Sequence, residues 1–215
     1  MVRIRQTAIV GTAALAVLAA GIAPASAAGT TIRSADDAPY SGNVQASLVG
    51  DATVSTSIGS GSCSQSTMTG SINSDGTGLS ISSADFSSCT GTASVTITAQ
   101  ALPWTGGNVT YDPDHTDGRD ATVTIANFNV KAVVNLFGGI TCVFGGNLTA
   151  NGYNPGNPVT NSDQAEVGVS GATVNKQSGS SFLCPSTATV TATYELKGET
   201  TAGSGTYDQT LHVTE

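Results

Sequence analysis

The sequence predicts an all-β protein, specifically an antiparallel β-sandwich of about ten short strands. Apolar and polar residues alternate along the chain, and this two-residue period is typical of β-strands. No stretch after residue 27 shows the three-to-four-residue period of a long helix. Thr, Ser, Gly, Val and Asn dominate that part of the chain, and Gly-containing turn signals separate its apolar runs. Four cysteines are available to staple such a fold.

The alternation is clearest in three stretches, each of which predicts a half-buried strand: 92–101, 128–136 and 189–197. The apolar residues Val123 and Ile125 precede the second stretch out of phase with it. One extra residue in the strand would restore the phase, so a β-bulge is predicted near Ala126 and Asn127.

A β-hairpin is predicted to join residues 121–136 to residues 140–150 through the turn Phe137-Gly138-Gly139. Two longer loops, rich in Asp, Asn, Pro and Gly, are expected at 111–120 and 153–164. These segments connect the apolar runs and therefore belong on the surface.

The first 27 residues have the features of a secretory signal peptide. Arg3 and Arg5 precede an apolar, Ala-rich stretch at 8–23, and the chain then reaches Pro24-Ala25-Ser26-Ala27. Small residues at this spacing predict cleavage after Ala27. The apolar stretch is too short for a membrane span and no second one follows, so we expect release outside the cell without membrane insertion.

The predicted mature chain, residues 28–215, is strongly acidic. It holds all fifteen Asp and Glu residues but only five Lys and Arg residues, which gives a formal charge of −10. Nucleic acid and anionic membranes would repel a protein with this net charge. Nucleic acid is therefore excluded as an expected partner, and the acidity favours solubility.

The cysteines Cys63, Cys89, Cys142 and Cys184 predict two disulfides, because thiols of an exported protein meet an oxidising environment. None of them has the short spacing of a zinc ribbon. We prefer the pairing of Cys63 with Cys89 and of Cys142 with Cys184, since an internal repeat places each pair in one unit. The other two pairings stay open.

The repeat is seen when the chain is aligned with itself. Residues 89–96 (CTGTASVT) recur as 184–191 (CPSTATVT), and 110–112 (TYD) recur as 206–208. The two offsets, 95 and 96 residues, are nearly equal, which favours a duplication over chance. Whether the repeats form one sandwich or two stays open. The predicted organisation is a signal peptide at 1–27, a mobile N-terminal arm at 28–40, and an all-β domain at 41–215 with repeat units 41–120 and 121–215.

Three features resemble small secreted two-disulfide β proteins of actinobacteria, whose function is uncharacterised. They are the Ala-rich signal peptide, the Ser/Thr/Gly-rich loop from Cys63 to Cys89, and the alternating strand that ends in Leu102-Pro103-Trp104. The resemblance implies an extracellular β-sandwich. It implies no catalytic residue.

No constellation of residues predicts an enzyme. A hydrolase of the Ser-His-acid type needs a histidine beside a serine, and the chain contains only His115 and His212. His212 alternates with the apolar Leu211 and Val213, which predicts that it faces solvent. The Gly-x-Ser-x-Gly motif of α/β-hydrolases is absent. We therefore expect no catalytic site.

The loop 112–120 holds the one concentrated polar cluster. Asp112, Asp114, Asp117 and Asp120 could supply the oxygen ligands that Ca²⁺ prefers. Their spacing departs from that of an EF-hand loop, and an Asp-rich and Gly-rich segment is also what a solvated turn needs. A calcium site and a plain turn are both compatible with this segment, and no other cofactor is expected.

Trp104, the single tryptophan, is compatible with two roles. An exposed ring could bind a sugar or a protein partner, whereas a buried ring would fill the core. We expect a secreted, non-catalytic protein that binds an extracellular protein or polymer or belongs to the cell surface. The alternatives are a calcium-dependent ligand-binding module and an inhibitor of a secreted protease, with the loop 153–164 as bait. The sequence specifies neither the ligand nor the oligomeric state.

Overall fold

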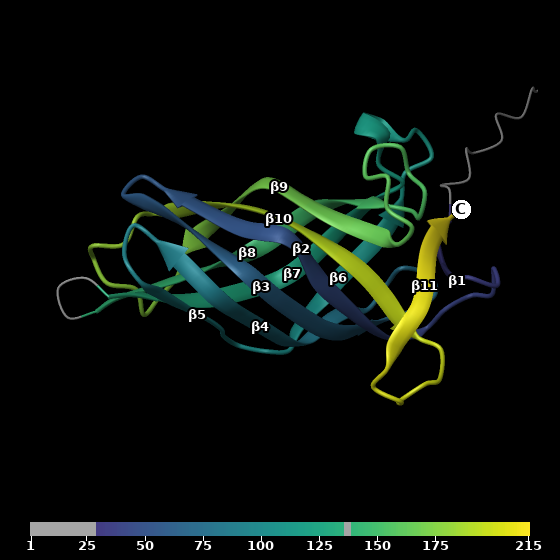
Figure 1. The fold of residues 1–215 in the computed structure, drawn as a ribbon, viewed down its shortest axis with the longest axis horizontal. Coiled ribbons are helices and arrows are strands. Elements are labelled where there is room, and N and C mark those ends of the chain that lie inside the picture. The colour runs from purple at the N-terminus through teal and green to yellow at the C-terminus, as the bar shows by residue number, and fades with distance from the viewer. Residues whose placement is uncertain (1–28, 136–138) are drawn as a thin grey trace, which may run out of the picture.

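The computed structural model describes residues 29–135 and 139–215, which form an antiparallel β-barrel (Figure 1). These residues form eleven strands and one short 3-10 turn, η1 (Thr116–Gly118). The strands are β1 (Thr31–Ser34), β2 (Gly42–Thr56), β3 (Gly59–Ile72), β4 (Leu79–Gly91), β5 (Val95–Ala99), β6 (Trp104–Tyr111), β7 (Ala121–Val134), β8 (Ile140–Tyr153), β9 (Ala165–Lys176), β10 (Thr187–Glu199) and β11 (Tyr207–Thr214).

The barrel has eight strand positions, and its order is β10-β2-β3-β4-β6-β7-β8-β9. It closes because β9 pairs with β10 as well as with β8. The short strand β5 shares a position with β6: both pair with β7, β5 over one half of it and β6 over the other. The prediction of a β-sandwich is therefore wrong. A sandwich has two sheets with free edges, whereas here strands of up to fifteen residues, bent by bulges, close one sheet on itself.

The bulge and the hairpin predicted around β7 are both confirmed. β7 pairs with β8 from Ala121 opposite Gly152 to Val134 opposite Ile140, and the register shifts between Ile125 and Phe128. Within this shift Asn127 has a φ of 58°, and its side-chain amide donates a hydrogen bond of 2.9 Å to the carbonyl oxygen of Thr105. Residues 136–138 of the predicted turn lie outside the described residues.

The segment predicted as a mobile arm is attached to the barrel. Within it, β1 pairs with β11, and both Ile32 and Tyr40 are buried. The Tyr40 hydroxyl donates to the carbonyl oxygen of Asn43 and accepts the N–H of Glu199 at 2.8 Å. Alternation could not reveal this strand, because only four residues pair. The predicted signal peptide at 1–27 lies outside the described residues.

The preferred disulfide pairing is confirmed. Cys63 and Cys89 lie directly opposite each other on β3 and β4, and Cys142 of β8 bonds to Cys184 in the loop before β10. Two disulfides indicate an oxidising environment, such as the outside of the cell. Secretion itself stays a prediction. Both predicted repeat units contribute strands to one barrel, and the duplication also stays a prediction.

A layer of large side chains crosses the middle of the barrel. Trp104 is 1% exposed, its ring centroid lies 4.9 Å from that of Phe128, and its indole N–H donates to the carbonyl oxygen of Gln100 at 2.8 Å. Nearby, the Tyr194 hydroxyl donates to the Ser66 hydroxyl at 3.1 Å. Of the two roles considered for Trp104, the structure therefore shows the buried one.

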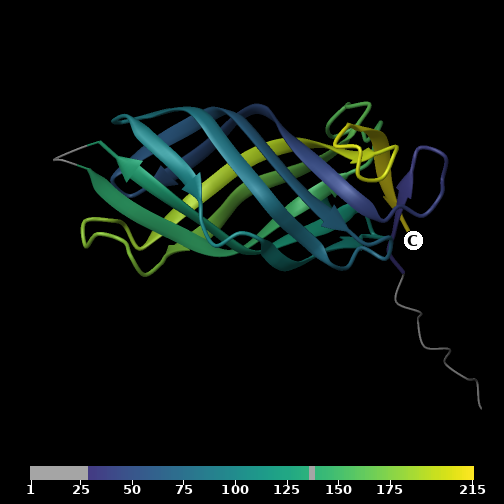
Figure 2. The same cartoon turned by 90° about the horizontal axis from the view of Figure 1, so that it is seen from below.

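The two ends of the barrel differ. At one end, β1 and β11 lie across the opening, and Ile32, Leu211 and Val213 are buried there (Figure 1). At the other end, inward-facing Val95 and Val134 are only partly buried. Figure 2 shows the strands winding obliquely from one end to the other. We call the first end closed and the second end open.

We expect Trp104→Ala to reduce the free energy of unfolding by about 3–5 kcal/mol, because it removes the largest fully buried side chain and leaves a cavity. Denaturant unfolding of the oxidised protein measures this change. The control is Phe182→Ala, which should cost less than about 0.5 kcal/mol because Phe182 is 88% exposed. Equal losses in the two variants would contradict the assignment of Trp104 to the core.

Candidate functional site

The open end of the barrel contains an apolar cavity of about 170 Å³. Strands β5, β7, β8 and β10 and the hairpin between β2 and β3 supply most of its wall, and β9, the end of β4 and the loops before β5 and β10 supply the rest. Its lining is mainly aliphatic and aromatic, and its apolar members include Val54, Ile58, Val95, Ile97, Phe128, Val130, Ala132, Val134, Ile140, Phe144, Val174, Pro185 and Val190.

The cavity exists because the inward-facing residues near the open end are small. β7 illustrates this, since Phe128 lies at the middle layer and is followed by Val130, Ala132 and Val134 at alternate positions towards the opening. On the opposite wall Gly61 pairs with Gly91, and a Cβ added to Gly61 would come within 2.9 Å of the Thr90 carbonyl oxygen. Small side chains leave the interior of an eight-stranded barrel partly unfilled.

Phe128 forms part of the floor of this cavity. A smaller cavity of about 80 Å³ adjoins it and shares Val95, Ile97 and Phe128 with it. On the other side of the middle layer, a third cavity of about 120 Å³ is lined by Leu79, Tyr194 and other buried residues of the closed end. Burial raises the pKa of the Tyr194 hydroxyl, so this group stays neutral and keeps its hydrogen bond to Ser66.

The outer margin of the open end carries exposed apolar side chains. Ile58, in the hairpin between β2 and β3, is 65% exposed, and Phe182 and Leu183, in the loop before β10, are 88% and 49% exposed. We call these three residues the apolar rim. The adjacent Cys184 is bonded to Cys142, and Ser181 donates its N–H to the carbonyl oxygen of Thr141 at 2.9 Å. The loop is therefore fastened to β8 on both sides of its two apolar residues.

The lining of the open-end cavity is apolar, with a few hydroxyl groups. All of its residues belong to the described part of the chain, and none has an ionisable or imidazole side chain. Its polar groups are the hydroxyls of Thr56, Ser60 and Thr92. Such a surface can exclude water from an apolar molecule and offer a few hydrogen bonds, which is the composition of a small-molecule binding pocket.

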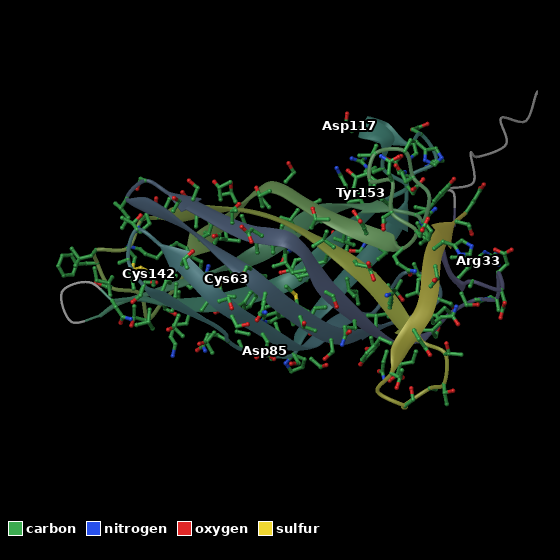
Figure 3. All side chains as sticks on the ribbon, in the orientation of Figure 1. Arg33, Cys63, Asp85, Asp117, Cys142 and Tyr153 are labelled. Carbon is green, nitrogen blue, oxygen red and sulfur yellow. A yellow bond between two sulfur atoms is a disulfide. The ribbon has the colours of Figure 1, made fainter. Side chains whose placement is uncertain are left out.

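The acidic loop predicted as a calcium site lies at the closed end, on the opposite side of the molecule. Asp112 and Asp120 are buried there, whereas Asp114 and Asp117 are exposed. Figure 3 shows Asp117 on the loop that projects beyond the barrel. The structure therefore brings two of the four predicted ligands into the interior of the loop and leaves two on its surface.

Asp112 and Asp120 are engaged by groups of the protein. An Asp112 oxygen lies 2.7 Å from Nε of Arg119, and the carboxylate accepts backbone N–H groups of the same loop. Asp120 accepts the N–H of Asn154 at 2.7 Å and the side-chain amide of Asn157 at 2.8 Å. Two loops are thereby joined. Within 29–135 and 139–215, no three or more His, Cys, Asp or Glu residues are arranged to hold a metal ion. The calcium site stays a prediction.

Both histidines also lie at the closed end. Nδ1 of His115 is 3.1 Å from Asp120, and Nε2 of His212 is 3.0 Å from Asp37. Leu211 and Val213, the neighbours of His212, are buried while His212 is partly exposed, as the alternation predicted. Neither histidine lines the open-end cavity.

Sequence reasoning missed both the cavity and the apolar rim. The rim leaves one local signal, since Phe182 and Leu183 interrupt an otherwise polar loop immediately before Cys184. The cavity has no signal in the sequence of any single strand, because it depends on small residues from strands far apart in the chain.

Comparison with protein families, with curated proteins and with solved structures finds no match to this chain. The described residues include no helix with the length and apolar character needed to cross a membrane.

We expect the protein to lose stability as the pH falls below about 4. Burial of Asp112 opposes its ionisation, but the hydrogen bonds from Thr116 and Asp114 and the charge of Arg119 outweigh it, and the pKa of the carboxyl is lowered. The N–H of Gly203 is the main cause of a lowered pKa at Glu199. A carboxyl with a lowered pKa stabilises the fold above its ordinary value, and this contribution is lost as the pH falls through its folded-state value.

Thermal melts of the wild type and of Glu199→Gln at a series of pH values measure this effect. The variant should be less stable at neutral pH and should lose less stability on acidification than the wild type. The exposed Asp117→Asn serves as the control and should follow the wild type. A melting temperature of the wild type that stays constant from pH 6 to about pH 2 would contradict the role given to these carboxylates.

Proposed function

We propose that this protein is a secreted binding protein that holds an apolar small molecule, or the apolar part of a larger one, in the cavity at the open end. The observation that carries the proposal is that inward-facing residues such as Val95, Ile97 and Val134 at that end are only partly buried. Apolar side chains that face an interior and still meet solvent form a surface that a ligand can cover.

The size of the cavity limits the ligand. A cavity of roughly 150 Å³ lined by apolar side chains accommodates a benzene-sized molecule. The open-end cavity, about 170 Å³, and the adjoining one of about 80 Å³ favour a single ring or a short aliphatic chain. Eight-stranded barrels are wide enough to hold one small ligand, which agrees with this size.

The cavity wall is held in place before any ligand binds. Cys142 is one of the lining residues, and its bond to Cys184 fixes the loop 177–186 beside β8. The Ser180 hydroxyl accepts the N–H of Val143 and donates to its carbonyl oxygen, and the N–H of Ser181 donates to the carbonyl oxygen of Thr141. A site that needs little ordering on binding loses less of its affinity to conformational entropy.

Affinity should rise with the apolar area of the ligand. Each buried methylene contributes about 0.8 kcal/mol, which is about a fourfold change in Kd. We therefore expect the Kd of straight-chain alcohols to fall about fourfold per added methylene until the cavity is filled and to level off beyond that length. Calorimetry or chemical-shift titration of residues 28–215 with a series from butanol to decanol measures this.

Two substitutions on β7 make a matched pair for the titration. Ala132→Trp places a large ring in the cavity and should weaken decanol binding at least tenfold, whereas Val133→Trp, at the next position and on the outer face, should leave it within about twofold. Failure of the wild type to bind any member of the series, or equal binding by both variants, would refute the proposed function.

A further inference from the structure

We propose that the open end of the barrel docks onto a lipid surface that contains anionic headgroups, with the apolar rim of Ile58, Phe182 and Leu183 inserted among the lipid chains. The evidence for docking is the exposed apolar rim and the distribution of charge. Docking would also let the cavity exchange its ligand with the lipid phase, and this consequence rests on the proposed function.

The rim is unusual in its exposure. Phe182 is 88% exposed and Ile58 is 65% exposed, so the phenyl ring and the branched aliphatic side chain both contact water in the isolated protein. They lie at the same end of the barrel, since Ile58 lines the cavity together with Pro185, which closely follows Phe182 and Leu183. Exposed apolar side chains gathered at one end mark a contact surface.

The net charge alone predicts repulsion from an anionic membrane, but the charges are distributed unevenly. The five described stretches that build the open end are 52–64, 88–99, 129–135, 139–145 and 171–191. They contain no Asp or Glu at all, and they contain two lysines, Lys131 and Lys176. All fifteen acidic residues lie elsewhere, and most belong to the closed end, where Figure 3 shows Asp117 far from Cys142.

Distance removes the effect of the distant acids. A strand of fourteen residues such as β7, tilted as in a barrel, spans about 35 Å along the axis. The Debye length is about 8 Å at physiological ionic strength, so carboxylates at the closed end are screened from a surface that touches the open end. Within the stretches that build the open end, the charged side chains are the two lysines, which favour anionic headgroups.

The rim is positioned to insert without large rearrangement. The bond between Cys142 and Cys184 and the hydrogen bond from Ser181 to Thr141 hold the loop that carries Phe182 and Leu183. Insertion of these side chains would bring the opening of the cavity against the lipid chains. Ile58 belongs to both the rim and the cavity wall, and Pro185 of the wall closely follows Phe182 and Leu183 in the chain. An apolar ligand could then pass between lipid and cavity without crossing water.

The test is co-sedimentation of oxidised residues 28–215 with vesicles of phosphatidylcholine containing 30 mol% phosphatidylglycerol. We expect the wild type to bind and the double variant Phe182→Ser, Leu183→Ser to bind at least tenfold more weakly with an unchanged melting temperature. Val159→Ser is the matched control, since Val159 is 54% exposed but lies in a loop of the closed end, and it should bind as the wild type does. Lys131→Gln should bind about fivefold more weakly to these vesicles and should be indistinguishable from the wild type on pure phosphatidylcholine.

The outcomes separate docking from ligand binding. Ala132→Trp should keep its affinity for vesicles although it loses decanol, and the rim double variant should keep its affinity for decanol although it loses vesicles. Absence of vesicle binding by the wild type, or equal losses for the rim and Val159 variants, would overturn the proposal. A wild-type dimer in sedimentation velocity that the rim variant converts to a monomer, without vesicle binding, would assign the rim to a second copy of the chain and would also overturn it.

Discussion

The pairing of β9 with β10 is the constraint on which the rest of the structure depends. It runs from Thr187 opposite Asn175 to Leu196 opposite Ala165 and closes the sheet, so each of the eight strand positions has neighbours on both sides. Once the sheet is closed, its inward-facing side chains alone decide what the interior contains. Trp104, Phe128 and Tyr194 fill the middle, β1 and β11 cover one end, and small residues leave the other end hollow. The cavity and its opening are both consequences of closure.

Alternation in the sequence predicted strands at 92–101, 128–136 and 189–197, which overlap β5, β7 and β10, and the bulge at Asn127, and the repeat added the disulfide pairing. It could not distinguish a barrel from a sandwich, because it shows which side chains share a face but not which strands become neighbours. The deciding pairs are distant in the chain: Thr189 of β10 lies opposite Ser55 of β2. The attachment of β1 was missed for the same reason, since its partner β11 lies at the other end of the chain.

The candidate site was predicted less well than the fold. The sequence predicted a site at acidic residues and at the single tryptophan, which are conspicuous residue types. In the structure Trp104 packs in the core, and Asp120 binds the first residue of a loop that begins 34 residues later. A carboxylate that accepts backbone N–H groups and one that ligates a metal have the same local sequence. The cavity arises instead from Val, Ala and Gly at inward positions of several strands, and these residues are inconspicuous in any one of them.

Crystallography of residues 28–215 under xenon pressure tests the central claim most directly, because xenon binds in preformed apolar cavities. The closed barrel predicts a continuous ladder between β9 and β10 and xenon density beside Val95, Ile97 and Phe128 at the open end. Two separate sheets with a free edge at β9 or β10, or side chains that fill the open end and exclude xenon, would contradict it.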